Sequence, residues 1–138
     1  MKRRLLLTAV VAATAMLTAS PNALAADDTN TGKPGRYPGG LPCTDNNSGA
    51  KACFEERGDK IWVRDYAGDG HSAIGVWHLY LGDGQYRKGW CRNKSGSGTW
   101  RVCNKEMGED QSIEFWAVDY DAETKSWTDW SLGRLEIN

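Results

Sequence analysis

The stretch from Lys60 to Leu81 constrains the fold most, because it contains two apolar runs joined by a glycine-rich turn. The residues on both sides of the turn Ala67–His71 are mostly β-branched or aromatic, a composition typical of strands that pack in a sheet. We therefore predict two strands here, paired with each other as a central hairpin.

Similar short runs, separated by turn residues, continue along the chain, and no long helical repeat interrupts them. The pattern predicts an all-β fold, a small antiparallel β-sandwich or barrel of about six to eight strands. Besides the hairpin, the expected strands lie around Ala52–Glu55, at Tyr86–Lys94 paired with Thr99–Lys105, at Ser112–Tyr120, and at Ser126–Ile137 as one strand or two.

The first 25 residues have the organisation of a secretory signal peptide. Met1–Arg4 is positively charged, Leu5–Leu17 is apolar, and Ala23–Ala25 is a small-residue cleavage site. The apolar run is shorter than the roughly 20 residues that span a bilayer. We expect residues 1–25 to be removed and the rest of the chain to be secreted and extracellular.

Residues 26–42 are rich in Gly, Pro, Asp and Thr and almost devoid of apolar side chains. Such a composition buries too little surface to offset the entropy of ordering, so we predict a flexible N-terminal tail, followed by a β-sandwich domain at residues 43–138. The tail is either a spacer or an arm that becomes ordered on a partner. In the second case Arg36 and Tyr37 are its expected anchor.

Four cysteines remain after signal removal, and an even number in a small exported chain indicates a disulfide framework. Three pairings are possible. We favour Cys43 with Cys53 and Cys91 with Cys103, because each pair encloses one hairpin-sized segment. Pairing across such a hairpin would place Trp90 and Trp100 on the face opposite the sulfur atoms. Zinc-ligand spacing is absent from the sequence.

The full chain has a net charge of −1, and loss of the basic signal peptide makes it more negative. A basic footprint is therefore missing, which argues against nucleic acid as a partner and against binding to an anionic membrane.

The glycine-rich turn of the central stretch contains no complete catalytic or metal-binding motif. Gly70–Ile74 lacks the second glycine of a nucleophile elbow, and no partner can be named for His71. Asp65 and Asp69 lack the spacing of a calcium-binding loop, while aspartate and glycine are common in turns for backbone reasons alone. The sequence thus predicts no enzyme activity, no cofactor and no metal.

Seven tryptophans are an unusual number for so short a chain. We assign Trp62, Trp77 and Trp116 to the core. Trp127 and Trp130 lie among polar residues and are candidates for an exposed surface that binds a sugar or a protein partner.

A signal peptide, a Gly/Pro-rich tail, four cysteines and the stretch VRDYAGDGHSA at residues 63–73 occur together in this chain. In this combination it resembles small secreted β-proteins of Streptomyces-like actinobacteria, and among them the adaptor component of umbrella toxin particles. That adaptor bridges a lectin-bearing, trypsin-like subunit and a large toxin. The resemblance implies that Lys33–Pro38 is a docking arm, and it transfers no catalytic residue.

The function expected from these observations is a secreted, non-enzymatic interaction module, an adaptor in an extracellular antibacterial toxin complex. Its partner-binding residues would be Lys33, Arg36, Tyr37, Trp127 and Trp130. One alternative is a carbohydrate- or cell-wall-binding module that uses the tryptophans. Another is a secreted protease inhibitor whose Arg36 enters a trypsin-like cleft.

Overall fold

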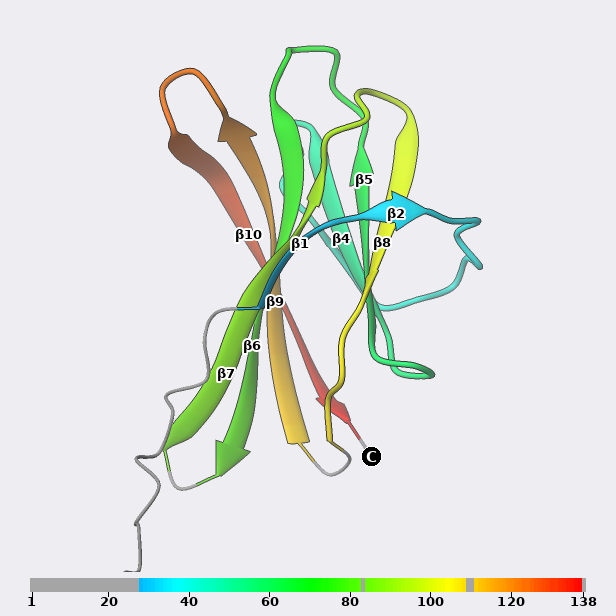
Figure 1. Ribbon diagram of the computed structural model, residues 1–138, viewed down its shortest axis with the longest axis vertical. Coiled ribbons are helices and arrows are strands. Elements are labelled where there is room, and N and C mark those ends of the chain that lie inside the picture. Colours follow the sequence, from blue (N-terminus) through cyan, green and yellow to red (C-terminus); the bar gives the residue numbers. More distant parts are fainter. Residues whose placement is uncertain (1–27, 83, 109–110, 138) are drawn as a thin grey trace, which may run out of the picture.

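The computed structural model describes residues 28–82, 84–108 and 111–137, with side chains up to Gly133. The chain folds into two five-stranded sheets that pack face to face (Figure 1). Sheet A has the spatial order β1 (Asp28–Thr31), β7 (Gln85–Asn93), β6 (Ser72–Gly82), β9 (Gln111–Asp121) and β10 (Ser126–Ile137). Sheet B has the order β2 (Lys33–Pro34), β8 (Thr99–Asn104), β5 (Lys60–Asp65), β4 (Ala50–Glu55) and β3 (Cys43–Asp45).

The predicted all-β class and the two-sheet sandwich are confirmed. Neighbouring strands are antiparallel except for β1 and β7, which run parallel. The described residues form ten strands instead of the six to eight expected, mainly because the short strands β1, β2 and β3 were not anticipated. None of the described residues forms a helix that could cross a membrane.

The predicted central hairpin is wrong. Its two strands exist, but β5 belongs to sheet B and β6 to sheet A, so the connection between them crosses from one sheet to the other (Figure 1). Both strands have apolar side chains on their inner faces, and these pack across the core instead of side by side. A Cβ atom at Gly75 of β6 would lie 2.8 Å from Ile61 and 2.9 Å from Val63 of β5. Strand composition alone does not distinguish these two arrangements.

The hairpin predicted at residues 86–105 is wrong for the same reason, because β7 lies in sheet A and β8 in sheet B. Both favoured disulfides are nevertheless confirmed. Cys43–Cys53 joins the neighbouring strands β3 and β4, whereas Cys91–Cys103 connects the two sheets, with the Cα atoms 5.8 Å apart. The second bridge is therefore part of the core, and both of its cysteines are buried.

The core lies between the sheets and is filled by large apolar side chains. Phe54 of sheet B and Phe115 of sheet A meet there with ring centroids 6.5 Å apart. Trp77 is fully buried and Trp62 nearly so, as predicted, although Trp62 lies on the outer side of sheet B, beside Tyr37.

Gly75 of β6 faces β5 closely across the core, and its replacement by alanine is expected to lower the free energy of unfolding by about 2 kcal/mol. The new methyl group would overlap Ile61 and Val63, which are both fully buried and cannot move aside freely. Urea unfolding measures the loss. Gly68→Ala is the matched control, because no atom lies within 4 Å of a Cβ there; equal losses in the two variants would contradict this packing.

The predicted flexible tail is wrong for the described residues 28–42, which belong to the sandwich. β1 pairs with β7 at the edge of sheet A, and β2 pairs with β8 at the edge of sheet B. The Nζ atom of the buried Lys105 donates hydrogen bonds to Asp28 (2.8 Å to Oδ1) and to Asn30. Backbone pairing and this ion pair supply the ordering energy that the polar composition lacks. The predicted signal peptide lies outside the described residues.

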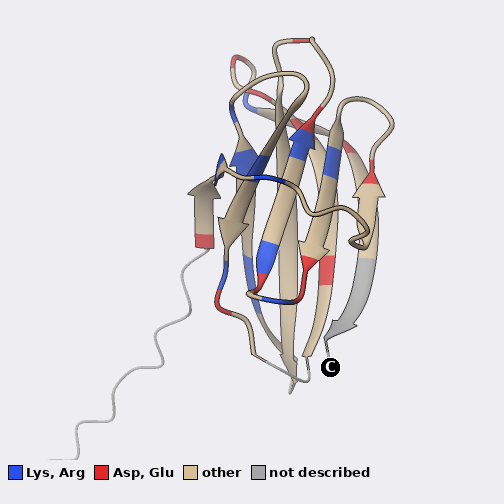
Figure 2. Ribbon diagram, turned by 90° about the vertical axis from the view of Figure 1, so that its right-hand side faces the viewer, with Lys and Arg blue, Asp and Glu red and all other residues tan. Residues whose placement is uncertain are grey.

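After β2 the chain crosses the outer face of sheet B (Figure 2). There the ring of Tyr37 stacks on Trp100 with a centroid distance of 3.9 Å and an interplanar angle of 3°, and it meets Trp62 edge-on at 5.8 Å. Gly35 lies directly against the Trp62 ring. The N-terminal segment thus covers the aromatic part of this face.

Candidate functional site

The outer face of sheet A, in contrast, exposes large apolar side chains. Every exposed large apolar side chain among the described residues comes from β6, β7 or β10: Tyr80, Leu81, Tyr86, Trp127, Trp130 and Leu132. Trp130 and Leu132 are 54% and 60% exposed. Contiguous exposed apolar surface on a small protein commonly marks a place where something binds.

A β-bulge in β10 brings Trp127 and Trp130 to the same face of the sheet. Residues three apart in a regular strand point to opposite faces. Here Thr128 pairs with Asp119 and Ser131 with Ala117, so β10 contains one residue more than β9 between these pairs. Asp129 takes up the extra residue with a left-handed φ of 56°. Bulges of this kind redirect side chains.

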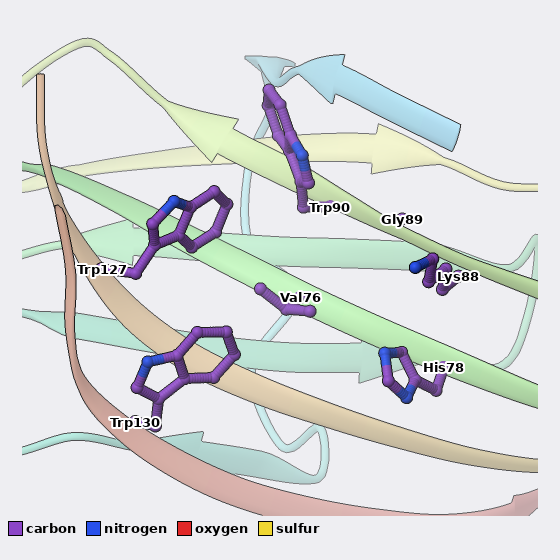
Figure 3. A pocket seen from close by; sticks show the side chains of 7 residues that line it. All are labelled: Val76, His78, Lys88, Gly89, Trp90, Trp127 and Trp130. Atoms are coloured by element: carbon purple, nitrogen blue, oxygen red, sulfur yellow. The ribbon is translucent and has the colours of Figure 1, made fainter. Parts of the chain in front are cut away.

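The two indoles consequently lie nearly parallel, with a centroid distance of 6.0 Å and an interplanar angle of 21°. They form one end of an open cleft with a volume of about 610 Å³, which we call the tryptophan cleft. Figure 3 shows its lining residues: Val76, His78, Lys88, Gly89, Trp90, Trp127 and Trp130. The three indoles surround Val76, while His78 and Lys88 lie farther along β6 and β7.

Ring contacts fix the position of Trp127. Its indole packs edge-on against Trp90 at 6.3 Å and against Tyr120 at 5.2 Å. The guanidinium of Arg92 lies 4.6 Å from the Tyr120 ring centroid and donates a hydrogen bond to Ser72 Oγ at 3.0 Å. These contacts hold the wall of the cleft in place before any ligand arrives.

The burial of Ile74 and Val118 also indicates that the wall of the cleft is packed in place. Their register places them on the outer face of sheet A, yet they are only 1% and 0% exposed. Side chains on this face must therefore cover them. The aromatic layer is a small packed unit on top of the sheet, and Trp130 at its edge keeps the larger exposed area.

A second set of rings follows along the same strands. His78 contacts Trp116 at 4.8 Å and Tyr86 at 5.3 Å, and Tyr86 lies 6.3 Å from Tyr80. The hydroxyl of Tyr80 donates a hydrogen bond to Glu114 Oε2 at 2.7 Å. Because His78 also lines the tryptophan cleft, the two sets of rings form one continuous surface.

Two buried carboxyl groups lie on the inner faces of the sheets, where β5 ends and β6 begins. Asp65 is 3% exposed and Asp119 is 4% exposed. Burial, together with the nearby carboxylates of Asp69 and Asp119, raises the pKa of Asp65 to about 6. Burial also raises the pKa of Asp119. Within the part of the chain that the structure describes, no group of three or more His, Cys, Asp or Glu could hold a metal ion.

The predicted site residues divide into two groups. Trp127 and Trp130 lie together in the cleft, whereas Lys33, Arg36 and Tyr37 lie on the N-terminal segment against sheet B. Lys33 and Arg36 are exposed, and Tyr37 is partly buried by its stacking.

The assignment of Trp116 to the core is wrong, because it is partly exposed on the outer face of sheet A. Trp90, His78 and Lys88 were not identified as site residues from the sequence. Strand alternation did place Trp90 opposite the buried Cys91, and that was the available signal.

The fold and this site together define a disulfide-bonded β-sandwich with an aromatic cleft on one sheet face. Two disulfides fit an extracellular protein. Comparisons with models of known protein families, with curated proteins and with solved structures found no match.

Proposed function

We propose that this protein is a secreted, non-enzymatic carbohydrate-binding module that holds a glycan in the tryptophan cleft. The observation that carries the proposal is the bulge at Asp129, which sets Trp127 and Trp130 side by side on an exposed sheet face. An indole ring offers a flat apolar surface that suits the C–H face of a pyranose, and its N–H group can bind a hydroxyl. The chain thus uses a strained backbone position to present sugar-stacking surface.

The polar lining of the cleft suits the same ligand. Sites for small ligands combine apolar walls with a few polar groups that fix orientation. Here Lys88 can donate hydrogen bonds to sugar hydroxyls, and the imidazole of His78 can donate or accept. The rings hold the sugar face, and these two side chains select its hydroxyl pattern.

Trp130→Ala is expected to weaken glycan binding at least tenfold while changing the free energy of unfolding by no more than about 0.5 kcal/mol, because Trp130 is 54% exposed. Isothermal titration with cellohexaose and with the hexamer of N-acetylglucosamine measures the affinity, and urea unfolding measures the stability. Leu132→Ala is the control, because Leu132 is exposed on the same face but does not line the cleft.

An adaptor for another extracellular protein would occupy the same face differently. A protein interface would cover both Trp130 and Leu132, so both alanine variants would weaken partner capture. A glycan in the cleft requires only Trp130. Unchanged glycan affinity in Trp130→Ala, or absence of binding to a broad glycan panel, would refute the carbohydrate function.

A further inference from the structure

Two groups of rings lie on the outer face of sheet A at different positions along its strands. The tryptophan group consists of Trp90, Tyr120, Trp127 and Trp130, and the tyrosine group of His78, Tyr80, Tyr86 and Trp116. On β7, Trp90 and Tyr86 are four residues apart on the same side of the strand, a separation of roughly 13 Å. This separation is larger than a single sugar ring.

We propose that the ligand is an extended, linear polysaccharide chain that lies along β6 and β7, with one sugar at the tryptophan group and another at the tyrosine group. The inference rests on the proposed carbohydrate function and adds the form of the ligand to it. The two groups are continuous, because His78 lines the tryptophan cleft and contacts Tyr86 at 5.3 Å. Tyr80 and Tyr86 are 38% and 50% exposed, so their rings are accessible for stacking.

The charge of the cleft lining disfavours one class of polysaccharide. Lys88 is the charged residue that lines the tryptophan cleft, and it lies between the two ring groups on β7. Aromatic walls alone would also suit a quaternary ammonium group. A lysine ammonium beside them repels such a cation and repels an amino-sugar polymer, while it can donate hydrogen bonds to uncharged hydroxyl and acetamide oxygens. A polymer that carries ammonium groups is therefore disfavoured at the tryptophan cleft.

A series of chain lengths tests the extended site. Isothermal titration uses oligomers of N-acetylglucosamine and of β-linked glucose with two, four and six units. In the series that binds, the hexamer is expected to bind at least tenfold tighter than the dimer. Tyr86→Ala is expected to remove the higher affinity of the hexamer and to leave the affinity for the dimer unchanged. Trp130→Ala is expected to weaken the binding of both the dimer and the hexamer. Tyr86→Phe, which retains the ring, restores the gain.

Comparison of two hexamers with the same backbone tests the charge. The hexamer of glucosamine carries ammonium groups where the hexamer of N-acetylglucosamine carries acetamides, and we expect it to bind at least tenfold more weakly. Lys88→Gln narrows this difference. Equal affinity for the two hexamers would overturn the exclusion of a polymer that carries ammonium groups.

Different results would refute the extended site and the carbohydrate function. If dimer and hexamer bind equally and Tyr86→Ala has no effect, the extended site is wrong, while loss of binding in Trp130→Ala still supports a carbohydrate module. If no oligomer binds, both are overturned. Thermal unfolding of each variant shows whether lost binding reflects lost structure, and Leu132→Ala is expected to retain every affinity.

Discussion

Replacing both Cys91 and Cys103 by alanine is expected to lower the free energy of unfolding by about 4 kcal/mol. The bridge closes a loop with a sequence separation of 12, and restriction of the unfolded chain by such a loop contributes about 3 kcal/mol. Loss of the buried sulfur atoms, which pack between the two sheets, adds to this cost. Urea unfolding of the oxidised protein and of the double variant measures the difference.

The other disulfide is the internal comparison. Cys43–Cys53 has a sequence separation of 10, so chain entropy predicts almost the same contribution for both bridges. It joins strands that already pair with each other, and Cys43 is partly exposed. We expect its double alanine variant to lose about 2 kcal/mol. Equal losses would show that connecting the sheets gives Cys91–Cys103 no additional role.

Asp65→Asn is expected to raise the free energy of unfolding at pH 7 by about 2 kcal/mol. Burial raises the pKa of Asp65 to about 6, well above the value of roughly 3.9 in an unfolded chain. The folded protein therefore binds this proton more tightly than the unfolded chain does. The stability that protonated Asp65 contributes is fully present below about pH 4 and is lost as the pH rises to about 6, a change of about 3 kcal/mol. Asparagine cannot ionise, so the Asp65→Asn variant keeps this stability at pH 7.

Urea unfolding at several values between pH 4 and pH 7 checks this expectation. Asp119, whose pKa burial also raises, contributes in the same direction, and its carboxylate raises the pKa of Asp65. The difference between the two curves therefore reports Asp65 together with its coupling to Asp119. Glu123→Gln removes an exposed carboxylate and is the control for net charge. A constant offset between wild type and Asp65→Asn across this pH range would contradict the assignment.

The two outer faces of the sandwich differ in a way that bears on function. On sheet B the chain's own N-terminal segment covers the aromatic residues, and Tyr37 stacks on Trp100. On sheet A the described residues leave Trp130 and Tyr86 at least half exposed. Similar aromatic surfaces thus have different roles, one in stability and one available for a ligand. This difference moves the candidate site from the N-terminal segment to the outer face of sheet A.

Local sequence located the strands from β4 to β10, favoured the correct disulfide partners and indicated the exposure of Trp127 and Trp130. Strand composition and turn residues act over a few neighbouring residues, so they locate a strand and its alternating faces. Cysteine spacing was informative because each pair closes a short segment. Tertiary structure alone decided which strands pair: β5 and β6, and likewise β7 and β8, pack across the core instead of side by side.

The cleft also depends on tertiary structure. Trp90 and Trp130 are distant in sequence and line one cleft only because β7, β6, β9 and β10 lie in one sheet. The local sequence of the N-terminal segment predicts a flexible tail, because the order of the segment comes from pairing at the sheet edges and from the buried Lys105. Lys105 is 77 residues away from its partner Asp28. Energies that arise from contacts between distant residues leave no local pattern, and for this reason only the folded chain shows them.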